Sequence, residues 1–143
     1  MWTVAILLPF APFSYLQPIM VGGGPGTWFL VGYLLYPTVG VGGFAAISSF
    51  LFAIETYELR RPNGRTMMAG LALLVGGVLS GCLLLGIAGV TGGYVIVIQH
   101  STVDVTERVL SPYVNVITAA SLIAVIGAGI SLYGMAAAKA TET

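Results

Sequence analysis

Long apolar runs separated by short polar stretches set the pattern of this chain. No charged residue occurs in residues 26–54 or in residues 66–99. Between these runs, residues 55–65 hold two of the five acidic and three of the five basic residues. About 20 predominantly apolar residues suffice for a helix to cross the hydrocarbon core of a bilayer. The pattern therefore predicts an all-α integral membrane protein in which residues 55–65 join two spanning helices.

Four transmembrane helices with short loops are expected, and they form a single helical domain over residues 1–143. Each apolar run is long enough for one span. The four spans are predicted at residues 2–20, 28–54, 66–90 and 113–138.

The first run differs from the others because it contains three prolines, Pro9, Pro12 and Pro18. A proline inside a helix removes a backbone hydrogen bond, although neighbouring helices can satisfy the freed carbonyl group. The run has neither the basic start nor the small-residue cleavage pattern of a signal peptide, so we expect it to be retained. A segment that only half enters the membrane, or lies at its surface, is the alternative.

Local signals place the ends of the second and third spans. Thr27 can cap the helix that follows the glycine-rich turn before it, and Thr66 can cap the next one. The 27 residues of the second span measure about 40 Å, which exceeds a hydrocarbon core of about 30 Å. Pro37 and the glycines after it predict a kink there. The sequence Pro62-Asn63-Gly64 predicts a tight turn.

The second half of the chain contains two expected breaks. Thr91, Gly92 and Gly93 are expected to interrupt the third helix. Residues 94–98 either extend that helix or form a short extended piece. Residues 99–111 are polar and predict a loop, after which Ser111 and Pro112 fit the N-cap and first position of the last helix.

Small residues recur at four-residue spacing in the predicted spans, which favours close contact between helices. In lipid, two apolar helices gain nothing from mutual burial, so their association depends on packing and close backbone approach. Residues spaced four apart lie on one side of a helix. The residues predicted to form these packing faces are Gly42, Ala46, Gly76, Gly77, Ser80, Gly81, Ala120, Ala124, Gly127, Ala128 and Ser131.

Composition and charge agree with the membrane assignment and restrict the partners. Charged residues make up 7% of the chain, against about 25% in soluble domains. The net charge is zero, so nothing indicates a nucleic-acid partner. Lipids and other membrane subunits are the expected partners.

The distribution of basic residues predicts the orientation in the membrane. Loops on the cytoplasmic side carry an excess of lysine and arginine. Arg60, Arg61, Arg65 and Lys139 lie in the 55–65 loop and the C-terminal tail, whereas the 99–111 loop has only Arg108. We therefore expect a multi-pass protein of the cell membrane with the first two segments cytoplasmic and the 99–111 loop extracytoplasmic. The three loop arginines also suit contact with lipid headgroups, although topology alone explains them.

Candidate catalytic and metal-binding groups are few. His100, the single histidine, stands beside Asp104 and Glu107, where it either helps bind a metal, acts as a pH-sensitive contact, or is simply a solvated loop residue. Glu55 and Glu58 lie one helical turn apart near arginines, which indicates an ion-pair cluster; a proton-entry carboxylate at Glu55 is the alternative. No catalytic residue, no metal site and no cofactor held by the chain's own residues is predicted, although contact with a lipid or quinone fits.

The order of these features resembles the last helices of haem–copper oxidase main subunits. The resemblance covers about residues 28–138. It rests on Glu-Leu-Arg-Arg-Pro-Asn-Gly-Arg at 58–65, Ile-Ala-Gly-Val at 87–90 and Ser-Pro-Tyr-Val-Asn-Val-Ile-Thr at 111–118. The histidines that hold haem and copper in that family have no counterpart in residues 28–54, so no catalytic role carries over. The resemblance implies a non-catalytic relative or companion subunit of a respiratory complex.

These observations favour a non-catalytic accessory or structural subunit of a larger membrane complex, of the kind that serves respiratory electron transport with a terminal oxidase. The chain would support assembly of that complex by packing its small-residue helix faces against other subunits. A small self-associating transporter or channel is the alternative, since two small-residue faces are also suited to a ring. A lipid-modifying enzyme is least favoured because no nucleophile has a base nearby.

Overall fold

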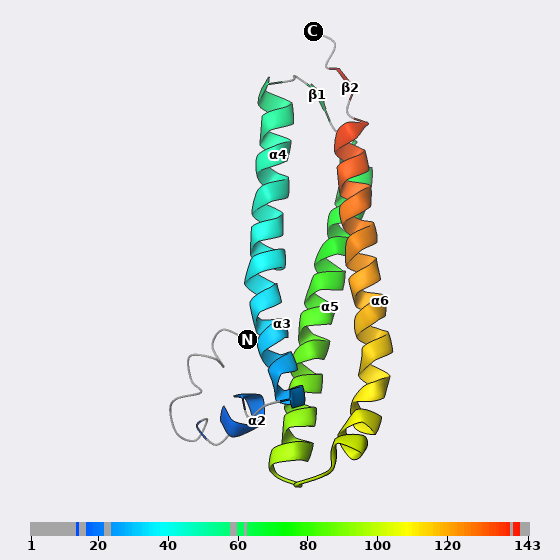
Figure 1. The fold of residues 1–143 in the computed structure, drawn as a ribbon. Helices are drawn as coiled ribbons and strands as arrows, with labels where there is room; N and C mark the ends of the chain where they lie inside the picture. Colours follow the sequence, from blue (N-terminus) through cyan, green and yellow to red (C-terminus); the bar gives the residue numbers. More distant parts are fainter. Residues whose placement is uncertain are drawn as a thin grey trace. The chain divides into compact units, whose positions relative to one another are not determined.

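The computed structural model describes residues 14, 17–21, 24–57, 60–61, 63–137 and 139–140, and helices dominate them. Figure 1 shows the helices and two short strands in chain order. The helices are α2 (Gln17–Val21), α3 (Thr27–Leu35), α4 (Gly43–Tyr57), α5 (Gly64–Val97) and α6 (Val103–Ala136); a 3-10 turn, η2 (Gly24–Gly26), precedes α3, and a π-helical segment, η3 (Tyr36–Gly42), joins α3 to α4. The strands are β1 (Arg60–Arg61) and β2 (Lys139–Ala140).

Three helical segments of the described chain are long and apolar enough to cross a membrane: Gly24–Tyr57, Gly64–Val97 and Val103–Ala136. Three of the four predicted spans, those at 28–54, 66–90 and 113–138, thus correspond to long apolar helices. Each segment has 34 residues, or about 51 Å of helix, against a hydrocarbon core of about 30 Å. Helices of that length extend beyond the hydrocarbon or tilt within it. The predicted first span at 2–20 lies mostly outside the described residues, and its end falls in α2.

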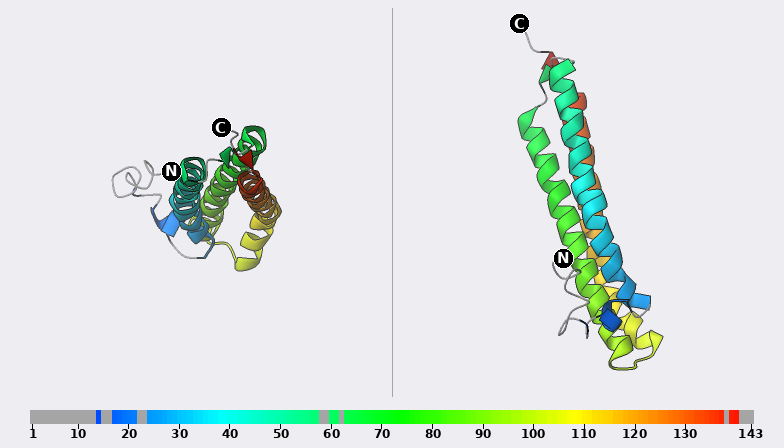
Figure 2. Two further views of the ribbon diagram at one scale, coloured as in Figure 1. Left: turned by 90° about the horizontal axis from the view of Figure 1, so that it is seen from above. Right: turned by 90° about the vertical axis from the view of Figure 1, so that its left-hand side faces the viewer.

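The chain divides into two compact units, and each contains part of α5 and part of α6. The first unit comprises Met1–Tyr36 and Ser80–Thr118, and the second comprises Pro37–Leu79 and Ala119–Thr143. In the first unit, α2 packs on α3 and η2, and both views of Figure 2 show α2 beside the start of α3.

The start of α3 differs from the prediction that Thr27 is its N-cap. Gly26 occupies the cap position, and Thr27 is the first helical residue. The Thr27 hydroxyl instead donates a 2.6 Å hydrogen bond backwards to the Gly24 carbonyl oxygen. Because η2 already turns the chain before Thr27, the helix starts without a side-chain cap. Gly24 has a φ of 56°, a conformation that glycine adopts without steric cost.

The irregularity predicted around Pro37 takes the form of the π-helical segment η3. Proline has no backbone N–H to donate and its ring crowds the preceding turn. A wider helical turn accommodates both effects without ending the helix. Residues Gly24–Tyr57 therefore remain one continuous candidate span.

The start of α5 corrects the prediction that Thr66 caps it. The helix begins at Gly64, and the Asn63 side-chain oxygen accepts a hydrogen bond from the Arg65 backbone N–H at 3.2 Å. The Asn63 carbonyl oxygen accepts from the Met67 N–H at 3.0 Å, which is the first hydrogen bond of the helix. Asn63 therefore serves as the N-cap, and Thr66 lies within the first turn.

Replacing Asn63 by alanine should lower the free energy of unfolding by about 1 kcal/mol, because one N–H of the first turn loses its partner. Asn63→Asp should retain the stability, since a carboxylate accepts the same bond and suits the positive end of the helix dipole. Thr66→Ala is the matched control for the earlier assignment. Thermal unfolding in detergent measures all three; a larger loss in Thr66→Ala than in Asn63→Ala would contradict the assignment of the cap.

Helix α5 does not break at Thr91, Gly92 and Gly93, contrary to the prediction; it continues to Val97. The Thr91 hydroxyl donates to the Ile87 carbonyl oxygen of its own helix at 2.8 Å. The two glycines are buried and lie against other segments of the first unit, as described below. Of the two alternatives for residues 94–98, the structure shows helix extension as far as Val97.

Helix α6 begins at Val103, so the prediction of a loop over residues 99–111 is wrong for most of that range. The Thr102 carbonyl oxygen accepts from the Thr106 N–H at 3.2 Å, and Asp104 in the first turn suits the positive helix end. Pro112 therefore lies inside the helix rather than at its first position. A proline inside a membrane helix is tolerated where other groups satisfy the freed carbonyl. The charged first turns extend the helix beyond its apolar part.

Several hydroxyl side chains within the long helices donate hydrogen bonds to the backbone of their own helix. Ser49 donates to Ala45, Thr118 to Val114 and Ser131 to Gly127, each to the carbonyl oxygen four residues earlier, at 2.8–2.9 Å. Such bonds remove the cost of an unpaired hydroxyl in lipid. These hydroxyls therefore need no ligand to explain them.

The two strands of the second unit tie the 55–65 connection to the C-terminal segment. Strands β1 and β2 pair in antiparallel fashion, with Arg60 opposite Ala140 and Arg61 opposite Lys139. The connection before α5 and the segment after α6 thus lie together, as Figure 1 shows. These two segments therefore share one end of the second unit.

Candidate functional site

The closest helix contact in the second unit joins α5 and α6 through predicted packing residues. A Cβ atom added at Gly77 would lie 2.5 Å from the Ala124 backbone nitrogen and 2.8 Å from the Ala120 carbonyl oxygen. A Cβ added at Gly127 would overlap the backbone nitrogen of Leu74. The two backbones touch at these points, and only glycine leaves room for the approach.

A second pair of small residues continues the same contact. A Cβ at Gly70 would lie 2.5 Å from the Ser131 hydroxyl oxygen and 2.9 Å from the Gly127 carbonyl oxygen. Ser131 is fully buried and donates to Gly127. Gly70 and Leu74 were not among the predicted packing residues. Gly70 lies four residues before Leu74, and Leu74 lies three before Gly77, which places all three on one side of α5 and is the signal that identifies them.

The other predicted packing residues have different surroundings. Gly81 is buried, and Ser80 and Ala128 are half-buried. Gly42, Ala46 and Gly76 are exposed, and a Cβ added at Gly76 meets nothing within 4 Å. Gly76 therefore takes no part in the contact between α5 and α6, although the next residue, Gly77, is at its centre.

The first unit contains close glycine contacts that the sequence analysis did not predict. A Cβ at Gly89 of α5 would overlap the Phe29 backbone nitrogen of α3, and one at Gly93 would overlap the Ile19 carbonyl oxygen of α2. A Cβ at Gly92 would lie 2.5 Å from the Pro25 ring. The glycines expected to break α5 are the positions where other segments reach its backbone.

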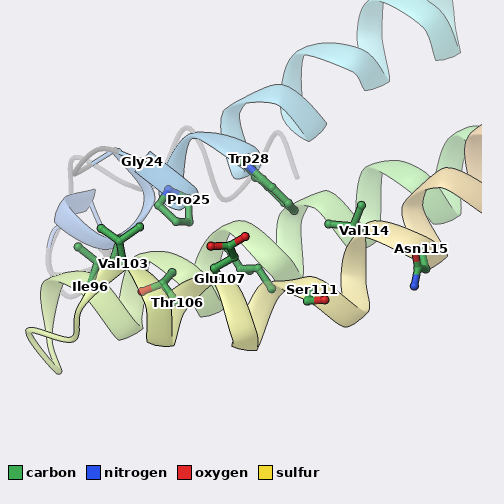
Figure 3. A pocket seen from close by; sticks show the side chains of 11 residues that line it. Gly24, Pro25, Trp28, Ile96, Val103, Thr106, Glu107, Ser111, Val114 and Asn115 are labelled. Atoms are coloured by element: carbon green, nitrogen blue, oxygen red, sulfur yellow. The ribbon is translucent and has the colours of Figure 1, made fainter.

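A groove of about 600 Å³ lies in the first unit between the start of α3 and the start of α6. One wall contains Gly24, Pro25 and Trp28, and Ile96 of α5 lies at one end (Figure 3). Seven residues of α6 form the facing wall in two helical rows. The first row is Val103, Glu107, Ser111 and Asn115, and the second is Thr106, Leu110 and Val114.

Three of the polar groups of this groove come from the first α6 row. Residues spaced by four recur on one side of a helix, so Glu107, Ser111 and Asn115 follow one another along the groove. Figure 3 shows the Glu107 carboxylate standing between α6 and the segment that contains Pro25, with the Trp28 ring extending from α3 toward α6. Thr106 in the second row is buried, and its hydroxyl donates to the Thr102 carbonyl oxygen at 3.2 Å.

A second pocket of about 220 Å³ extends the groove into apolar surroundings. It shares Trp28 and Val114 with the first pocket. Its further walls are Val31, Leu85 and the α6 residues Ile117 and Thr118. Together the two pockets offer a polar end near Glu107 and an apolar end beside Ile117. This arrangement suits an elongated, amphipathic molecule.

The groove does not follow from the sequence pattern alone. Glu107 stood out beside His100, but it was expected in the 99–111 loop and not in a helix. The four-residue spacing of Glu107, Ser111 and Asn115 has meaning only once residues 103–111 are helical. The opposite wall depends on which helix packs against α6, which the spacing does not encode.

The other candidate residues show no site. His100 is exposed in a turn with a φ of 50° after α5, and Glu55 is exposed at the end of α4. Among the described residues, no three histidine, cysteine, aspartate or glutamate side chains are grouped so as to hold a metal ion. Arg65 is exposed in the first turn of α5.

No family model, no curated protein and no solved structure matches this chain.

Proposed function

We propose that the chain is a non-catalytic accessory subunit of a larger membrane protein complex, of the respiratory type that contains a terminal oxidase. It holds its place by packing apolar helix faces against other membrane subunits. The observation that carries the proposal is the unpacked surface of α4, and the resemblance to oxidase main subunits supports the type of complex.

Helix α4 has no buried residue over its 15 positions. Its phenylalanines Phe50 and Phe52 are 64% and 65% exposed. Gly42, at the end of η3, and Ala46 form a small-residue pair one turn apart on this exposed surface. Bulky side chains suffice to face lipid, whereas small residues allow another backbone to approach. The surface of α4 around Ala46 thus fits a helix of another subunit.

The respiratory assignment rests on the resemblance of residues 58–65, 87–90 and 111–118 to the last helices of oxidase main subunits. The absence of histidine from residues 28–54 leaves the chain without that family's haem and copper ligands. A companion subunit needs none of these ligands. Its role is to stabilise the catalytic subunits and to contact the lipid or quinone around them.

The proposed orientation places Arg60, Arg61 and Arg65 in the cytoplasm, because basic residues are retained on that side. The antiparallel pairing of β1 with β2 keeps Lys139 at the same end. The short connection around His100 is then extracytoplasmic. The membrane concerned is the cell membrane.

Photocrosslinking from α4 tests the proposal. A photoreactive amino acid at Ala46, introduced into the chain in its native membrane, should form a crosslink to a different and larger polypeptide. Ser48 is the matched control, because it is exposed on the same helix but roughly 200° around its axis from Ala46. We expect the Ser48 position to label lipid, or to label protein far less strongly.

Two outcomes would contradict the proposal. Crosslinks from Ala46 only to a second copy of the chain would favour the self-associating transporter or channel. Labelling of lipid alone from both Ala46 and Ser48 would show that α4 faces the bilayer on both sides and has no partner.

A further inference from the structure

The residues that line the groove between α3 and α6 determine which charge a bound ligand can carry. Glu107 is the single ionisable residue in the described lining, and no lysine, arginine or histidine joins it. Trp28 stands on the opposite wall (Figure 3). An aromatic ring attracts cations to its face, most strongly when the ring is that of tryptophan. A carboxylate facing an indole ring therefore favours a positively charged group over a neutral or negative one.

The Glu107 carboxylate is available for such a group. Among the residues the structure describes, none donates a hydrogen bond to it or pairs with it as an ion. Its neighbour Arg108 is displaced by about 100° around α6 and does not line the groove. Asp104, the other acidic residue of these turns, also lies outside the lining. Within the part of the chain that the structure describes, no residue therefore compensates the negative charge in the groove.

The shape of the groove sets the rest of the ligand. From Glu107 to Thr118, α6 advances about 16 Å. Over this distance the walls change from Glu107 and Ser111 to Val31, Leu85 and Ile117. Glu107 lies in the polar first turns of α6, and Ile117 lies in its apolar part. A ligand that follows the groove has a charged end near the membrane surface and an apolar body directed into the hydrocarbon.

We propose that this groove binds an amphiphile bearing an ammonium group, with the cation between Glu107 and Trp28 and the apolar chain extending toward Ile117. Two sources share this chemistry: the headgroup of an aminophospholipid and a free alkylammonium cation. The proposal does not depend on the accessory-subunit role, because the groove lies in the first unit and α4 in the second.

Ligand titration of the purified full chain in uncharged maltoside micelles tests the proposal. With Trp2→Phe as background, Trp28 is the remaining tryptophan and reports on the groove. Decylammonium should change the Trp28 fluorescence saturably and raise the melting temperature, whereas decanol, which matches it in length but is uncharged, should do neither. Glu107→Gln should weaken decylammonium binding about tenfold, and Asp104→Asn, the matched control, should leave it unchanged.

A second arm distinguishes the sources: short-chain phosphatidylethanolamine is compared with short-chain phosphatidylglycerol. Saturable binding of the ethanolamine lipid that requires Glu107 identifies a headgroup site, and binding of decylammonium alone identifies a site for free cations. Equal binding of decanol and decylammonium, or equal effects of Glu107→Gln and Asp104→Asn on both the fluorescence and the melting temperature, would overturn the proposal. Tighter binding of phosphatidylglycerol than of phosphatidylethanolamine would also overturn the proposal, because it would show that the groove does not select an ammonium group.

Discussion

Replacing Gly77 by leucine is expected to destabilise the chain by about 2–3 kcal/mol, since the new side chain meets backbone rather than a movable neighbour. The added Cβ would lie 2.5 Å from the Ala124 nitrogen and 2.8 Å from the Ala120 oxygen, so α5 and α6 must move apart in the second unit. Both helices would then lose the close approach on which association in lipid depends. Equilibrium unfolding in mixed micelles measures the loss.

Gly76→Leu is the matched control for this prediction. It makes the same change one residue away on the same helix, where an added Cβ meets nothing within 4 Å. Because leucine favours a helix by up to about 1 kcal/mol over glycine, this variant should be as stable as the parent or slightly more so. Equal losses in Gly76→Leu and Gly77→Leu would show that helix propensity or lipid contact, not the α5–α6 approach, sets the stability.

Neutralising Arg60, Arg61 and Arg65 together is expected to produce chains of mixed orientation. These residues are three of the five basic residues, and topology follows the balance of lysine and arginine between the two sides. A tag at the C-terminus of the triple Arg→Gln variant should become partly accessible from outside intact cells. Modification of the tag by a membrane-impermeant reagent measures this fraction.

Arg108→Gln is the control for the orientation experiment. Arg108 lies in the opposite polar stretch, so its loss increases the charge difference between the two sides and should keep the parent orientation. Unchanged accessibility of the tag in the triple variant would contradict the role assigned to Arg60, Arg61 and Arg65.

The sequence pattern predicted the three long helices because uninterrupted apolar runs have few other stable structures. It predicted the boundaries less well. The last span was expected at 113–138, whereas α6 covers Val103–Ala136. Charged residues mark where an apolar run ends, but the helix itself continues past that point: α6 includes Asp104, Glu107 and Arg108. Hydrophobicity therefore locates the membrane portion of a helix and not its ends.

The glycines of the third span led to one wrong prediction, a helix break at residues 91–93, and to one correct prediction, a packing position at Gly77. Gly92 and Gly93 suggested a break because glycine disfavours helices in water. They are helical in the structure, and Pro25 and Ile19 approach their backbone so closely that a larger side chain has no room. Gly77 was correctly placed on a small-residue row, but its partners were not predictable, since spacing within one helix carries no information about the register of the next.

The groove could not be predicted from the sequence, because it too depends on how one helix packs against another. Glu107, Ser111 and Asn115 share one α6 row, which follows from the sequence once the helix is known. That Trp28 stands opposite them depends on the packing of α3 within the first unit. Tertiary contacts of this kind bring together residues almost 80 positions apart, and no local pattern specifies them.

The role as an accessory subunit can be tested by purifying the tagged chain from its native membrane in a mild detergent and analysing it by native mass spectrometry. We expect a complex in which the 14.8 kDa chain is present at fixed stoichiometry with larger membrane subunits of different sequence. Recovery of the chain alone, as a monomer or as a homo-oligomer, under conditions that keep other membrane complexes intact, would contradict it.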